Sequence, residues 1–120
     1  MRRVEATPMT DHVRLTAVPR LRVRFAGETI VDTERAYVVH EGSMSARYYV
    51  PREDVRAEIT DTTDGASCPW KGQWRHLDLT LGATRVPAAA WTYYATTPVC
   101  APIQGFVAFY ANKVEAIEVG

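Results

Sequence analysis

The sequence predicts a mostly β domain in which two small antiparallel sheets meet at an angle, as in a β-tent, with one short helix. Three observations support this fold class. Short apolar stretches alternate with polar residues, turn-forming residues separate them at short intervals, and only one stretch has a helical pattern. The 120 residues suit a single domain with a hydrophobic core of its own.

Residues 1–19 are expected to form an extended N-terminal arm, and residues 20–120 are expected to form the single β domain. Prolines interrupt the arm, and no apolar period runs through it. After it, residues 21–25 alternate apolar with charged side chains, and residues 26–29 supply a tight turn into residues 30–31. This arrangement is typical of a β-hairpin.

Two further strands are expected at residues 36–40 and 47–50. The one short helix is expected to begin near Pro51, because proline suits the first turn of a helix. Val55 and Ile59 follow at a spacing of four, which places them on one helical face.

Residues 60–67 are polar and are predicted to be a loop. The strand at residues 74–81 has apolar residues of both parities, since Trp74 belongs to one face of an extended chain and Leu77 to the other. A β-bulge near residues 75–76, or a strand that passes there from one sheet to another, would move the buried face from one parity to the other.

The C-terminal part supplies the remaining strands. Residues 88–94 combine small and aromatic side chains, and residues 97–102 are predicted to be a loop bounded by prolines. Two final strands, at residues 106–110 and 114–119, flank a turn at residues 111–113.

Composition limits the partners and the compartment. Fourteen basic residues balance fourteen acidic ones, so the chain has no general attraction for nucleic acid or for an anionic membrane. No apolar stretch resembles a signal peptide or a membrane span, which favours the cytoplasm. Cys68 and Cys100 lack paired spacing and are expected to be free thiols, with no metal and no cofactor.

Five segments, taken in order, resemble a bacterial family called domain of unknown function 427: residues 22–28, 48–55, 68–72, 90–93 and 105–110. The resemblance runs from about Arg14 to Val119. It implies a β-tent-like fold with a pocket between two sheets, and it implies no established activity. After Trp91 the chain departs from the family pattern, because residues 93–96 replace a Tyr-Pro pair and an acidic residue.

The family label mentions nucleotidyl transfer, which requires paired carboxylates to hold metal ions beside the phosphates. Asp61 and Asp64 have the wrong spacing for such a pair, and residues 65–67 are too short to be a phosphate-binding loop. The residues therefore argue against this chemistry.

Residues 67–74, written SCPWKGQW, are interpreted as one wall of the pocket. In an extended chain Lys71 and Arg75 point away from the face of the neighbouring tryptophans. They would then face a small acidic or carbonyl-bearing ligand, while Gly72 would let another backbone or a ligand approach closely. The alternative is that both cations face solvent. The full set of candidate ligand-binding residues is Tyr49, Arg52, Glu53, Cys68, Trp70, Lys71, Arg75, Trp91 and Tyr110.

The favoured function is binding of a small polar or acidic metabolite between the two sheets, which requires a concave apolar wall and a few polar groups. One alternative is a small enzyme that uses Cys68, Lys71 or Glu53. Another is a protein-interaction module that forms homodimers through an aromatic patch or strand edges. Simpler roles also remain, with Cys68 a buried apolar residue and His40 and His76 ordinary strand residues.

Overall fold

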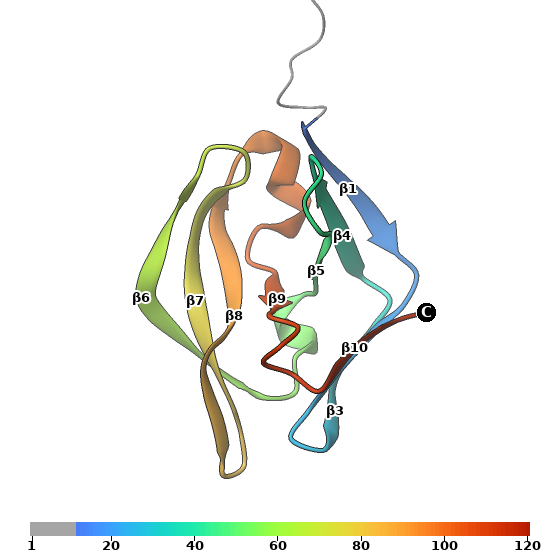
Figure 1. The fold of residues 1–120 in the computed structure, drawn as a ribbon, viewed down its shortest axis with the longest axis vertical. Helices are drawn as coiled ribbons and strands as arrows, with labels where there is room; N and C mark the ends of the chain where they lie inside the picture. Colours follow the sequence, from blue (N-terminus) through green and yellow to red (C-terminus); the bar gives the residue numbers. More distant parts are fainter. Residues whose placement is uncertain (1–11) are drawn as a thin grey trace, which may run out of the picture.

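The structure is a computed structural model that describes residues 12–120. Within this part of the chain, ten strands form three antiparallel sheets. The four-stranded sheet stands on one side, and the two three-stranded sheets stand on the other (Figure 1). The predicted mostly β, antiparallel architecture is confirmed, with three hydrogen-bonded sheets where two were expected.

The first three-stranded sheet has the order β1-β4-β5. Strand β1 (Val13–Val18) pairs along its whole length with β4 (Ala36–Glu41), and β4 pairs with the short β5 (Arg47–Tyr49). The expected arm therefore contains a strand of the domain, because buried Val13 and Val18 attach its second half to the core. Residues 1–11 of that arm lie outside the described residues.

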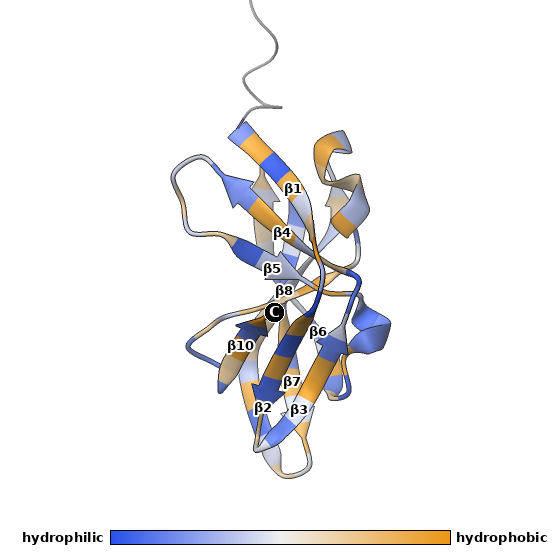
Figure 2. Ribbon diagram, turned by 90° about the vertical axis from the view of Figure 1, so that its right-hand side faces the viewer, coloured by the Kyte–Doolittle hydropathy of each residue, from blue (hydrophilic) through white to orange (hydrophobic). Residues whose placement is uncertain are grey.

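The second three-stranded sheet contains the hairpin that the alternating residues predicted. Strand β2 (Leu21–Phe25) lies between β3 (Glu28–Thr33) and the C-terminal β10 (Ala116–Val119). Ala26 and Gly27 have φ angles of 52° and 80°, as a tight hairpin turn requires. Figure 2 shows apolar and polar residues alternating along β2.

The four-stranded sheet has the order β6-β7-β8-β9. Its strands are β6 (Glu58–Cys68), β7 (Gly72–Leu81), β8 (Thr84–Thr96) and β9 (Val107–Phe109). The loop expected at residues 60–67 is wrong, since these residues belong to β6. They are polar because β6 is the edge strand of the sheet and most of its side chains are exposed.

The helix prediction was too long. A single 3₁₀ turn, η1 (Arg52–Asp54), follows Pro51, and Val55 is already extended, with φ −89° and ψ 120°. Ile59 lies in β6 rather than on a helical face. A second 3₁₀ segment, η2 (Pro98–Ile103), occupies the stretch that was expected to be an irregular loop.

Strand β7 has irregular pairing, but not at residues 75–76, where the bulge was expected: Arg75 and His76 pair regularly with β8, and the irregularities lie on either side of them. Its pairing with β8 shifts register between Gln73 and Trp74 and again between Leu77 and Leu79. Leu77 and Leu79 are fully buried in the main core. On the N-terminal side of these leucines, Trp74 packs against a separate cluster of buried aromatic residues.

The core has two parts. The larger is formed mainly by aliphatic side chains from β2, β3, β7, β8 and β9. The smaller is more aromatic and includes buried Tyr49, Trp91 and Tyr93 together with Cys100 and Ile103. Because residues of this aromatic cluster also line a cavity that combines aromatic and charged side chains, the candidate site lies beside it.

Candidate functional site

A cavity of about 310 Å³ lies between β4 and β5 on one side and β7 and β8 on the other. This volume is at the lower end of the range of small-molecule sites. Its lining combines aromatic rings with three charged side chains. The lining residues are Val39, Glu41, Met44, Ser45, Arg47, Tyr49, Cys68, Lys71, Trp74, Trp91, Tyr93 and Tyr110.

The aromatic residues of the cavity hold one another in place. The Trp91 Nε1–H donates a hydrogen bond to the Tyr49 hydroxyl oxygen at 3.1 Å, and the two rings meet edge to face. The Tyr110 ring lies 4.5 Å from the Trp91 ring. Burial raises the pKa of Tyr49 and of Tyr93 well above the usual value of a phenol. These hydroxyl groups therefore serve as neutral hydrogen-bonding groups.

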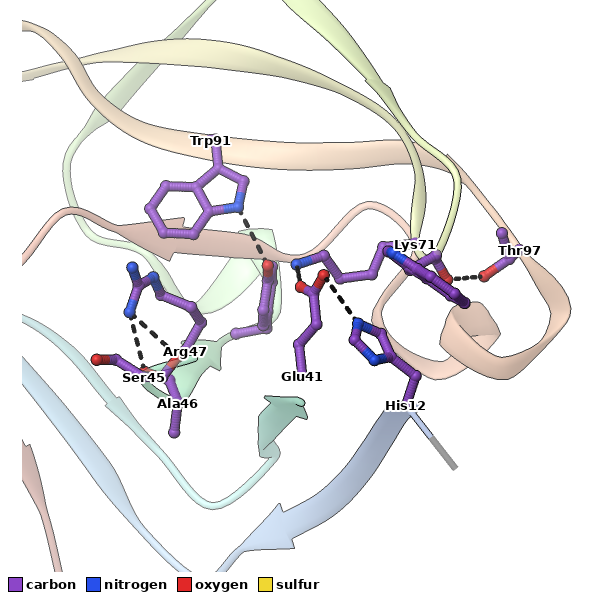
Figure 3. Close-up of polar contacts among 10 residues, drawn as sticks. His12, Glu41, Ser45, Ala46, Arg47, Lys71, Trp91 and Thr97 are labelled. Carbon is purple, nitrogen blue, oxygen red and sulfur yellow. Dashed lines mark hydrogen bonds and ion pairs between the residues drawn. The ribbon is translucent and has the colours of Figure 1, made fainter. Parts of the chain in front are cut away.

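Glu41 and Lys71 form an ion pair at one end of the cavity (Figure 3). Each side chain is only 11% exposed. His12 approaches the other Glu41 oxygen at 3.7 Å, and the Lys71 ammonium also lies 5.6 Å from the centre of the Tyr93 ring. Because Glu41 already neutralises Lys71, this lysine is not a free cation for an acidic ligand.

The backbone around Lys71 is fixed by its neighbours. The Thr97 N–H donates to the Lys71 carbonyl at 3.0 Å, and the Thr97 hydroxyl donates to the Trp70 carbonyl at 2.9 Å. Gly72 has φ +125°, and a Cβ atom there would lie 2.2 Å from the Ala95 carbonyl oxygen. The close backbone approach that was predicted at Gly72 is confirmed.

Arg47 supplies the second cation of the cavity. Its Nη1 donates to the Ser45 and Ala46 carbonyls at 3.2 and 3.4 Å, and Figure 3 shows its guanidinium group beside Trp91. Among residues 12–120, no carboxylate forms a salt bridge with it. Arg47 is therefore the cation with spare hydrogen-bonding capacity at this site.

Five of the nine residues predicted from the sequence lie together in the cavity lining: Tyr49, Cys68, Lys71, Trp91 and Tyr110. Trp70 lies next to it and stacks on His12, with ring centres 4.2 Å apart. Trp70 is not part of the cavity lining. Its contact with His12, which approaches Glu41, places it near the Glu41–Lys71 ion pair and outside the space for a ligand.

The other three predicted residues lie elsewhere. Arg52 pairs with Asp61. The exposed Glu53 carboxylate lies 3.3 Å from Arg35. Arg75 lies over Tyr94, 4.1 Å from the ring centre, in a separate surface hollow. Lys71 and Arg75 thus do not share a face, because the strand geometry assumed between them is interrupted: Lys71 belongs to the turn before β7 and Arg75 to the strand itself.

Seven lining residues are absent from the candidate set, although one of them, Trp74, belongs to the stretch that was predicted to form a wall of the pocket: Val39, Glu41, Met44, Ser45, Arg47, Trp74 and Tyr93. Two of them had a usable signal. Glu41 is an acid that ends an otherwise apolar strand, and Tyr93 has the same strand parity as Trp91. Arg47 had none, since its role depends on how β5 packs against β8 and β9.

Cysteines and clusters of metal-binding side chains are the other features that could carry chemistry. Both cysteines are free thiols, and burial raises the pKa of Cys100. In the described part of the chain, no group of three or more His, Cys, Asp or Glu residues is placed to hold a metal ion. No described helix has the length and apolar character needed to cross a membrane.

The fold and the cavity define a small all-β domain with a ligand-sized pocket, lined by aromatic and charged residues, between its sheets. The chain belongs to the family described as domain of unknown function (DUF427), whose model matches residues 14–120. A comparison with curated proteins returned no match. The match covers almost the whole of the described chain.

Proposed function

We propose that this protein binds a small polar or acidic metabolite that carries a flat ring, in the cavity between β4–β5 and β7–β8. The observation that carries the proposal is the position of Arg47, a cation without a carboxylate partner among the described residues, beside the ring of Trp91. A guanidinium group can donate two parallel hydrogen bonds to a carboxylate or one to a carbonyl oxygen.

The remaining groups fit such a ligand. The rings of Trp91 and Tyr110 offer flat apolar contact, and aromatic contact of this kind stabilises by about 0.5–1.5 kcal/mol beyond area burial. The Glu41–Lys71 pair offers a donor and an acceptor close together, so it suits a polar substituent better than a bare anion. Arg47, rather than Lys71 or Arg75, is thus the residue that would bind the negative charge of the ligand.

The two alternative functions receive less support. Of the residues named for an enzyme, Cys68 and Lys71 share the cavity, but Lys71 is paired with Glu41, and the 70% exposed Glu53 side chain pairs with Arg35 outside the cavity. The large apolar side chains exposed in the described part of the chain, Met44, Tyr94 and Val119, lie on three different elements. These three residues therefore do not share a strand or loop around which a homodimer interface could form.

Thermal unfolding in the presence of matched small molecules tests the proposal. Benzoate carries both the ring and the carboxylate, benzyl alcohol lacks the charge, and acetate lacks the ring. Benzoate is expected to raise the Tm most. In Arg47→Gln this advantage over benzyl alcohol should disappear, because the charge-assisted hydrogen bonds are lost.

Arg75→Gln is the matched control, since it removes the same charge from the outer hollow. It should respond to benzoate as the parent protein does. The proposal fails if none of the three molecules raises the Tm of the parent, or if Arg47→Gln and Arg75→Gln respond to benzoate equally.

A further inference from the structure

Asp64, His76 and Tyr110 form a continuous hydrogen-bonded chain that the binding proposal does not use. The His76 Nδ1 lies 2.9 Å from the Asp64 carboxylate, and the His76 Nε2 lies 2.9 Å from the Tyr110 hydroxyl oxygen. Asp64 is 80% exposed, whereas His76 is 21% exposed. Tyr110 lines the candidate pocket. The chain therefore runs from solvent to the pocket.

A bulge in β6 creates this arrangement. The β6–β7 pairing is interrupted between Asp61 and Gly65, which frees Asp64 to turn toward His76. The Thr62 hydroxyl donates to the His76 carbonyl at 2.8 Å and accepts from the Asp64 N–H at 3.1 Å. Bulges often direct a side chain in this way.

Gly65 permits the bulge to lie tightly against β7. A Cβ atom at this position would lie 1.9 Å from the Trp74 carbonyl oxygen. Any other residue would therefore push the bulge, and Asp64 with it, away from His76. Residues 60–67, which were predicted to be a loop, thus form a bulged part of strand β6.

The hydrogen-bond roles follow from the chemistry of the groups. An ionised carboxylate only accepts hydrogen bonds, so in neutral His76 the proton is on Nδ1 and Nε2 carries the lone pair. The Tyr110 O–H then donates to Nε2, and the lone pairs of its oxygen remain available to a group in the pocket. An acid, an imidazole and a hydroxyl in this order are the arrangement used to activate a hydroxyl group.

We propose that Asp64, His76 and Tyr110 form a general acid–base site that acts on a carbonyl-bearing ligand in the pocket, with Tyr110 as the group that touches the ligand. This inference rests on the proposed function, because the pocket must hold the ligand. In the forward step an acidic C–H proton next to the carbonyl group passes to the Tyr110 oxygen. The Tyr110 proton passes at the same time to His76 Nε2.

The step leaves balanced charges. The electron pair of the broken C–H bond stays on the ligand as an enolate, and His76 becomes an imidazolium ion that Asp64 stabilises. Arg47, in the same cavity lining, faces the enolate charge. Burial raises the pKa of Tyr110, so a free tyrosinate is disfavoured and the proton has to move to His76 as the new bond forms.

Covalent labelling tests the activated hydroxyl group without any metabolite. With benzenesulfonyl fluoride, the Tyr110 oxygen would form an O–S bond, fluoride would leave, and the phenol proton would pass to His76. Mass spectrometry of peptides gives the amount of label on Tyr110 relative to the exposed Tyr94 on the outer face. This ratio should fall at least about ten-fold in His76→Phe, which keeps an aromatic ring but removes the base.

Asp64→Asn changes an exposed side chain and should lower the ratio less, because an amide oxygen still accepts a hydrogen bond from Nδ1. The proposal is overturned if Tyr110 is not labelled in the parent protein or if His76→Phe leaves the ratio unchanged. Benzoate binding in the Arg47 test is independent of this result, so the acid–base proposal can fail while the binding proposal stands.

A second measurement uses the parent protein only and does not depend on the folding of a variant. Nitrogen-15 NMR of the imidazole should show His76 protonated on Nδ1 and unprotonated on Nε2 at neutral pH. A parent protein with the proton on Nε2 would contradict the proposal, because Tyr110 could then not pass its proton to His76.

Discussion

Lys71 and Glu41 join two parts of the molecule that are 30 residues apart in sequence. Glu41 ends β4, and Lys71 lies in the turn between β6 and β7, so their ion pair connects opposite sides of the pocket. Both side chains are almost completely removed from solvent. Such a pair stabilises a unique geometry only when both partners are present.

Glu41→Leu alone is therefore expected to destabilise the fold by about 3–5 kcal/mol, because it leaves the Lys71 ammonium buried without its partner. Lys71→Met should cost a similar amount. The double variant should cost much less than the sum of the two, since no uncompensated charge remains. Urea unfolding of the four proteins measures the coupling, and additive losses would show that the pair is not coupled.

Gly65→Ala tests the tight approach of the β6 bulge to β7. The added methyl group cannot fit beside the Trp74 carbonyl, so we expect a loss of about 1–3 kcal/mol in the free energy of unfolding. Gly120→Ala is the control, because a Cβ atom there meets nothing within 4 Å. Equal stabilities of the two variants would mean that the bulge moves without cost.

The strands of the domain could be predicted where one face is apolar and the other polar. Alternation along β2 gave the hairpin, and the mixed parity of Trp74 and Leu77 indicated irregular pairing in β7. β6 could not be predicted in this way. As an exposed edge strand it buries little apolar surface, so its strand character comes from pairing with β7 rather than from its own composition.

The site was predictable only in part, and the reason is geometric. Trp91 lies in β8, and Tyr110 directly follows the adjacent strand β9, so the contact between their rings could be inferred from the order of the strands. Arg75 was assigned to the pocket on strand alternation counted from Lys71, but Lys71 precedes the strand. His76 read as an ordinary strand residue, because its two partners come from positions 12 and 34 residues away.

The buried phenol of Tyr49 should make stability depend on alkaline pH. Burial raises the folded-state pKa of Tyr49 above the value of about 10 for an unfolded chain. The stabilisation from the neutral form is thus fully present below about pH 10 and is lost as the pH rises toward the folded-state pKa. The loss from one such group is at most about 1.4 kcal/mol per pH unit.

Tyr49→Phe is expected to be less stable than the parent at pH 8, by about 1–3 kcal/mol, since the buried Trp91 Nε1–H loses its acceptor. The difference should narrow between pH 10 and 11, because the variant lacks the titrating group. Urea unfolding at pH 8, 10 and 11 measures it. A difference that stays constant over this range would show that Tyr49 does not control the alkaline dependence.

The two cysteines should differ in reactivity in the folded protein, although both are free thiols. Cys68 lines the pocket and is partly exposed, whereas Cys100 is fully buried and its pKa is raised by burial. A thiol reagent needs access to the sulfur and reacts with the thiolate form, so burial and the raised pKa both slow the reaction of Cys100. One equivalent of iodoacetamide should therefore react quickly with the folded protein, and the second only after unfolding. Benzoate in the pocket should slow the first reaction in the parent protein but not in Arg47→Gln. If Cys68 reacts at the same rate with and without benzoate in a parent protein that benzoate stabilises, the ligand occupies a different cavity from the one between β4–β5 and β7–β8.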